Sequence, residues 1–129
     1  MIVLAGRNLA KMETAKAELD ELGVESHLCK TDIADRAQVQ ALAEFAASLG
    51  DVTQVIHTSG VSPSDTATEN IIKINAVGTV NMVEAFYPAL TEGGVMINFS
   101  SVAAYTMSKK FVIYFTQKNV ARFAEKHCR

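Results

Sequence analysis

Short apolar runs alternate with longer segments of helical periodicity along this chain. Apolar content and length predict strands over four segments, at residues 1–5, 24–30, 52–57 and 95–99. Apolar residues that recur every three or four positions predict helices over residues 9–22, 36–49, 68–90 and 105–128, the third broken near Pro88. Strands that alternate with helices predict an α/β fold, a doubly wound parallel sheet between two helical layers.

Polar and glycine residues mark the helix ends. Asn8 and Asp35 are predicted N-caps, because a side-chain oxygen there can accept a free backbone N–H of the first turn. Gly23 and Gly50 are predicted to end these helices. No repeat or low-complexity linker divides residues 1–129, which predicts a single domain.

Composition excludes several classes of function. The chain has 129 residues, 49% of them apolar, and a formal net charge of −2, which argues against a nucleic-acid binder. Neither a signal peptide nor a membrane-spanning segment is recognisable in the sequence. Cys29 and Cys128 are far apart and form no metal-binding pair, so we expect reduced thiols in a soluble, cytoplasmic protein.

The segment from Ser100 to Lys109 concentrates reactive side chains. Tyr105 and Lys109 stand four residues apart, so a helix would place them one turn apart on one face. A fixed positive charge lowers the pKa of a phenol from about 10, which makes it a usable acid or base near neutral pH. Tyr105 is therefore a candidate for proton transfer.

This Tyr-x-x-x-Lys pattern, after a strand ending in Ser100-Ser101, resembles the short-chain dehydrogenase/reductase family. Residues 74–78, Ile-Asn-Ala-Val-Gly, look like the catalytic asparagine segment of that family. Residues 57–60, His-Thr-Ser-Gly, stand where the family usually has Asn-Asn-Ala-Gly. The segments occur in the family's order, which strengthens each match.

The resemblance implies an oxidoreductase that interconverts a small-molecule carbonyl and a secondary alcohol by hydride transfer. Tyr105 would exchange the proton, Lys109 would lower its pKa and hold the nicotinamide ribose, and Ser101 would bind the substrate oxygen. Asn75, in a kinked helix, would maintain a water-linked proton relay to the lysine. The alternatives are a surface Tyr–Lys pair, a helix-interior amide at Asn75, and Ser100 in place of Ser101.

The resemblance also implies a cofactor. The family places an NAD-selecting acidic residue where this chain has Gly6 followed by Arg7, and a guanidinium can clamp the 2′-phosphate of NADP. We therefore expect NADP rather than NAD, the alternative being that Arg7 only covers the adenine. Asp32 would accept a hydrogen bond from the adenine amino group, with Ile33 packed nearby. The alternative is that Asp32 is a plain helix-start carboxylate.

Ser59 and Gly60 would let the backbone approach the cofactor's ribose. His57 is interpreted as a strand-end histidine, since no ligand pattern surrounds it, and no metal is expected. Apolar residues on more than one face of the helices at 68–90 and 105–128 predict a homodimer or homotetramer, the alternative being burial within one chain.

The chain also departs from the family pattern. It lacks the glycine-rich turn, and if residues 1–5 are the family's second strand, a gap would separate them from residues 52–57. We therefore expect segments missing before Met1, between about Ser101 and Tyr105, and after Arg129. The alternative functions are a non-catalytic dinucleotide-binding or regulatory protein, and an epimerase or dehydratase of the extended family.

Overall fold

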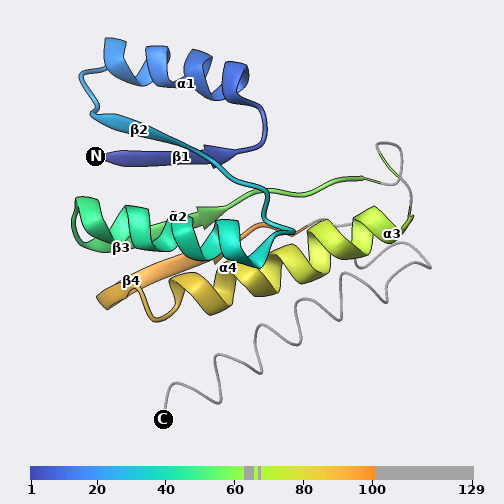
Figure 1. The fold of residues 1–129 in the computed structure, drawn as a ribbon. Coiled ribbons are helices and arrows are strands. Elements are labelled where there is room, and N and C mark those ends of the chain that lie inside the picture. Colours follow the sequence, from blue (N-terminus) through green and yellow to red (C-terminus); the bar gives the residue numbers. More distant parts are fainter. Residues whose placement is uncertain (63–65, 67, 101–129) are drawn as a thin grey trace.

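The computed structural model describes residues 1–62, 66 and 68–100, and it has the predicted alternation of strands and helices. The elements are β1 (Ile2–Gly6), α1 (Leu9–Glu21), β2 (Ser26–Lys30), α2 (Arg36–Leu49), β3 (Val52–His57), α3 (Thr68–Ile71), the π-helix η1 (Ile72–Gly78), α4 (Thr79–Phe86) and β4 (Leu90–Asn98) (Figure 1). The Rossmann-type α/β prediction is confirmed. The helix predicted over residues 105–128 lies outside the described residues.

Both predicted N-caps are confirmed. The Asn8 Oδ1 accepts the Lys11 N–H at 3.1 Å at the start of α1. The Asp35 Oδ1 accepts the N–H groups of Ala37 and Gln38 at 2.9 and 3.2 Å at the start of α2. The backbone hydrogen bond from Gln38, followed by its side-chain amide, lowers the pKa of Asp35, because these bonds stabilise the carboxylate.

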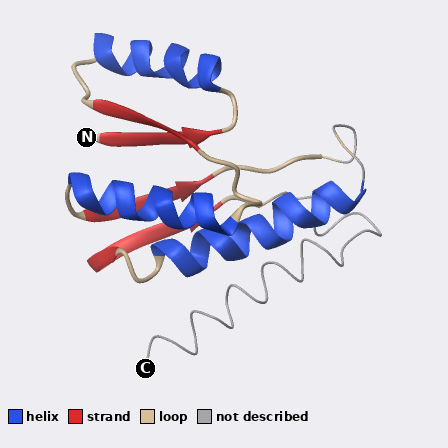
Figure 2. Ribbon diagram, viewed as in Figure 1, coloured by secondary structure: helices blue, strands red, loops and turns tan. Residues whose placement is uncertain are grey.

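Helices cover both faces of the strands (Figure 2). Gly6 of β1 faces α1, where an added Cβ would lie 3.4 Å from the Met12 sulfur. Val3 of the same strand and Cys29 of β2 instead pack against the core cluster that includes Val39 of α2. Since alternate residues of a strand point to opposite faces, α1 and α2 lie on opposite sides of β1.

The strands form two parallel pairs. β1 pairs with β2 and β3 pairs with β4, and no ladder among the described residues joins β1 to β3. Figure 1 shows the order β2, β1, β3, β4. The interruption lies at the place where the sequence predicted a gap, between the strand at residues 1–5 and the strand at residues 52–57.

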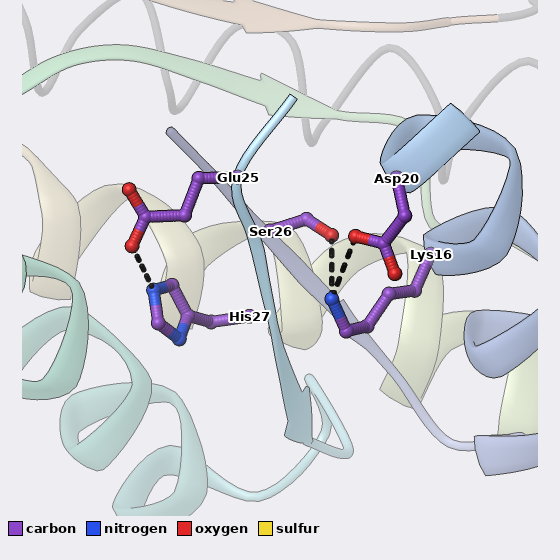
Figure 3. Close-up of polar contacts among 5 residues, drawn as sticks. All are labelled: Lys16, Asp20, Glu25, Ser26 and His27. Atoms are coloured by element: carbon purple, nitrogen blue, oxygen red, sulfur yellow. Dashed lines mark hydrogen bonds and ion pairs between the residues drawn. The ribbon is translucent and has the colours of Figure 1, made fainter. Parts of the chain in front are cut away.

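The core lies between α2, α4 and the β3–β4 pair. Its buried residues are Val39, Leu42, Ala43, Val52, Val55, Met82, Ala85 and Phe86. An ion pair of 2.9 Å between Arg36 and Glu84 joins α2 to α4 at the rim of this core. Outside this core, Lys16 of α1 contacts Asp20 at 2.9 Å and Ser26 of β2 at 3.5 Å (Figure 3).

The predicted break near Pro88 in the helix over residues 68–90 is confirmed, but the helix does not continue to residue 90. α4 stops at Phe86, and a turn through Pro88 leads into β4, which begins at Leu90 rather than at residue 95. The strand starts early because it contains an irregularity: Val52 pairs with Leu90, but Gln54 pairs with Val95. Gly93 has a φ of +77°, which glycine adopts without steric cost, so the strand continues through the bulge.

Candidate functional site

The sequence-predicted cofactor residues follow the carboxyl ends of three strands. Gly6 ends β1, Asp32 and Ile33 follow β2, and residues 57–60 end and follow β3. The strand ends point to the same side of the fold in Figure 1. Ligands of open α/β sheets bind at this edge, so the fold gathers these residues where a ligand site is expected.

Arg7 lies in the turn between β1 and α1. Its side chain is exposed, and it shares an open surface depression with Asn8 and Leu9. None of the ion pairs formed by the described residues includes Arg7. The guanidinium is thus available to an anion beside the first turn of α1, whose free N–H groups also favour negative charge.

Asp32 shapes the turn after β2 and does not cap α2. Its Oδ1 accepts the Ala34 N–H at 3.0 Å, and its own N–H donates to the Gln38 Oε1 at 2.9 Å. The cap of α2 is Asp35, so Asp32 has a local structural role in the turn before that helix. Its second carboxylate oxygen has no hydrogen-bond partner among the described residues.

Ile33 is held by the π-helical segment and α4, a contact that the sequence did not predict. The Asn81 Nδ2 donates to the Ile33 carbonyl at 2.9 Å. Gly78 lies so close that an added Cβ would be 2.7 Å from the Ile33 Cδ1 and 2.8 Å from its Cγ1. These two residues therefore fix the turn that carries Asp32.

Asn75 lies in the π-helix η1 and binds the loop after β3. Its Oδ1 accepts the Val61 N–H at 2.9 Å, and its Nδ2 donates to the Val61 carbonyl at 2.8 Å. An added Cβ on Gly60 would lie 3.5 Å from the same Oδ1. The structure thus brings Asn75 to Gly60, and the amide binds backbone 14 residues away rather than its own helix.

His57 is buried at the end of β3, with 4% of its surface exposed. Its Nε2 lies 3.3 Å from the Thr79 Oγ1, and its carbonyl accepts the Phe99 N–H at 3.0 Å. Burial lowers the pKa of His57 below its usual value, because the charged imidazolium would lose its hydration. The histidine is a strand-end residue as predicted, and it also contacts Thr79, the first residue of α4, which directly follows the η1 segment of Asn75.

Burial of a neutral histidine makes stability depend on pH. In the unfolded chain His57 binds a proton near its ordinary pKa of 6.5, but in the folded chain it does so only at lower pH. We therefore expect the free energy of unfolding to fall as the pH drops below about 6.5 and to level off below the folded pKa. Urea denaturation between pH 7.5 and 5.5 measures this slope, and an equal slope in His57→Gln would contradict it.

Three predicted catalytic residues, Ser101, Tyr105 and Lys109, lie outside the described residues. Ser59 and Ser100 are described, and both are exposed at the carboxyl ends of β3 and β4. In the described part of the chain, no three potential metal ligands lie close enough together to hold an ion. No helix there has the length and hydropathy needed to cross a bilayer.

Sequence comparison gives one family. The model of the short-chain dehydrogenases matches residues 1–127. The short-chain dehydrogenase/reductase bsc3 of Alternaria brassicicola is 33% identical over 78 residues, which are 60% of this chain and 28% of that protein. The human 17-beta-hydroxysteroid dehydrogenase 13 is 28% identical over 94% of this chain and 44% of its own length. The chain thus spans less than half the length of these two relatives.

Solved structures share the fold. The alcohol dehydrogenase of Thermococcus sibiricus, complexed with 5-hydroxy-NADP, superposes with a TM-score of 0.82 at 19% identity over 96% of this chain and 59% of that one. A short-chain dehydrogenase/reductase of Burkholderia phymatum in complex with NAD has a TM-score of 0.76 at 23% identity, over 96% of this chain and 48% of its own. At these identities the likeness establishes the fold.

Proposed function

The chain belongs to the short-chain dehydrogenase family, and from that premise we propose that it is part of an NADP-dependent reductase of small carbonyl compounds. The observation that carries the proposal is the paired hydrogen bond between Asn75 and the backbone of Val61. It fixes the predicted catalytic asparagine against the predicted cofactor loop, at the edge where Gly6 and Asp32 also lie.

The proposed reaction adds a hydride to the carbonyl carbon and a proton to its oxygen. Bound NADPH supplies the hydride. Tyr105 gives the proton, Lys109 lowers the pKa of the phenol, and Ser101 donates a hydrogen bond to the oxygen as negative charge develops there. Asn75 holds the loop after β3 in place while the secondary alcohol forms.

Arg7 supports NADP over NAD. It is exposed and forms no ion pair with the described residues, and it follows Gly6, which stands where the family has the acidic residue that would repel a 2′-phosphate. Asp32 and Ile33 are proposed to receive the adenine, and Ser59 and Gly60 the ribose. The free second oxygen of Asp32 is the acceptor available to the adenine amino group.

We predict that Arg7→Leu weakens NADPH binding roughly 10- to 100-fold and leaves NADH binding within about twofold. The hydrogen bond from the guanidinium to the 2′-phosphate, which NADH lacks, is charge-assisted and contributes about 1.5–3 kcal/mol. Its loss corresponds to that factor in affinity. Fluorescence titration of both cofactors measures it. Lys16→Met removes a positive charge from α1, away from Arg7, and is the matched control. Equal losses of affinity for NADPH and NADH in Arg7→Leu would contradict the assignment.

The proposed activity is tested by NADPH oxidation with the full-length protein and a panel of ketones and aldehydes. A rate that requires both NADPH and the carbonyl, with an alcohol as product, supports the proposal. NADPH binding without turnover of any compound on the panel would instead favour a non-catalytic dinucleotide-binding protein.

Residues 1–129 are proposed to form one domain together with further segments of the protein. The unpaired edges of β1 and β3 face each other, and one more parallel strand would satisfy both. Exposed Ile72, Val77 and Val80 on the segment from η1 to α4 support the proposed homodimer or homotetramer. A cytoplasmic location remains a prediction from the cysteines.

A further inference from the structure

His57, Thr79 and Asn75 form a chain of hydrogen bonds whose direction can be assigned. The Thr79 hydroxyl donates to the Asn75 carbonyl at 2.8 Å, and a hydroxyl has a single hydrogen to donate. At 3.3 Å from the same oxygen, the His57 Nε2 must therefore be the donor. His57 is thus protonated at Nε2, and burial keeps the ring neutral with Nδ1 unprotonated.

The Thr79 hydroxyl replaces a backbone bond that the π-turn removes. In a regular α-helix the Asn75 carbonyl would accept the N–H of Thr79, four residues on. Here that N–H donates to the Ala76 carbonyl, and the Thr79 side chain binds the Asn75 carbonyl instead. The threonine therefore stabilises the irregular turn, and His57 holds the threonine from the end of β3.

The π-turn decides where the Asn75 side chain points. A π-turn contains about one residue more than an α-turn. Since each residue of an α-helix turns the chain by about 100°, the extra residue rotates the side chains before it by that angle relative to those after it. If the turn became regular, Asn75 would rotate away from Val61 and its two hydrogen bonds of 2.9 and 2.8 Å would be lost. The loop with Gly60 would then lose its tie to the helix.

We propose that His57 and Thr79 are positioning residues that hold Asn75 in register with the cofactor loop, through the bond from His57 to Thr79 and from Thr79 to the Asn75 carbonyl. His57 stands where the family usually has an asparagine, so this connection is a feature of this chain's own sequence. The inference rests on the proposed function for its effect on catalysis, but its geometry can be tested without any activity.

The test compares Thr79→Val, which keeps the shape and removes the hydroxyl, with Thr79→Ser, which keeps the hydroxyl, in the full-length protein. In Thr79→Val we expect the NMR signals of the Asn75 side-chain amide to lose their exchange protection, kcat to fall roughly tenfold, and KM for NADPH to rise, because the loop proposed to receive the ribose loses its tie to the helix. Thr79→Ser should keep the wild-type signals and rate. Unchanged Asn75 signals in Thr79→Val, or equal damage in both variants, would overturn the inference.

His57 offers a second pair of variants. His57→Gln keeps an N–H donor near the position of Nε2, and His57→Leu removes it. We expect His57→Leu to behave as Thr79→Val does, with no further loss when the two are combined, because both break one connection. Additive losses in the double variant would contradict the shared path.

The wild-type protein provides a test that does not depend on any variant folding. Nitrogen chemical shifts of the His57 ring at pH 7.5 should show a proton on Nε2 and none on Nδ1. The opposite tautomer would overturn the assigned bond. If the protein reduces no carbonyl compound, the proposed function fails, while the Asn75 amide signals and the His57 tautomer still decide this inference.

Discussion

Tyr105→Phe is expected to lower kcat for carbonyl reduction by roughly 10²- to 10⁴-fold, the contribution typical of a positioned acid or base. Phenylalanine keeps the ring and removes the proton that the carbonyl oxygen must receive. NADPH binding should stay within about twofold of the parent value, since the phenol is not assigned to the cofactor. Single-turnover rates and fluorescence titration measure the two quantities separately.

Tyr87→Phe is the matched control for this prediction. Tyr87 is the C-cap residue of α4 and is not among the residues to which the proposed reaction assigns a role. Its loss should leave kcat within about twofold. A Tyr105→Phe variant that retained the parent kcat would remove Tyr105 from the mechanism and leave the proton donor unassigned.

Gly78→Ala is expected to destabilise the fold and to weaken NADPH binding. The new Cβ would lie 2.7 and 2.8 Å from two Ile33 side-chain carbons and 3.4 Å from its carbonyl carbon, so the buried end of the Ile33 side chain must shift. Overpacking costs about 1–3 kcal/mol, whereas alanine in a helix gains at most about 1 kcal/mol over glycine. The overpacking term is the larger, and urea denaturation should show a net loss of stability.

A double-mutant cycle with Ile33→Ala provides the control. Shortening Ile33 removes the two carbons that the new methyl group would meet, so Gly78→Ala should cost less in that background. The same cost in both backgrounds would contradict steric contact as the cause. Ile33 is itself proposed to pack near the adenine, so each NADPH affinity is compared within its own background. The loss caused by Gly78→Ala should be smaller in the Ile33→Ala background than in the parent.

Local signals predicted most of the helix and strand positions. Asn8 and Asp35 cap their helices as expected, because the capping interaction spans three residues and can be read from the sequence. The early start of β4 was missed because Gly93 and Gly94 mark both helix ends and strand bulges, and pairing with β3 decided between them. Local sequence carries no information about that partner.

In the candidate site, too, the residues could be predicted from the sequence but their long-range contacts could not. Asn75, Gly60, Asp32 and Arg7 were found through the resemblance to the family, and the structure places them at one edge of the strands. The contacts that hold them were not predictable, because Asn81 reaches Ile33 across 48 residues and His57 reaches Thr79 across 22. A sequence shows which polar residues a buried helix contains, and only the fold shows which loop each one binds.

The most direct test of the proposed reductase is an isotope transfer measurement with the full-length protein. NADPH that carries deuterium as the transferable hydride at C4 of its nicotinamide is incubated with a ketone that the protein reduces. The product is analysed by mass spectrometry and NMR. We predict one deuterium on the carbinol carbon of the alcohol for each NADPH oxidised. A product without deuterium, or an epimerised product with no net NADPH consumption, would contradict it.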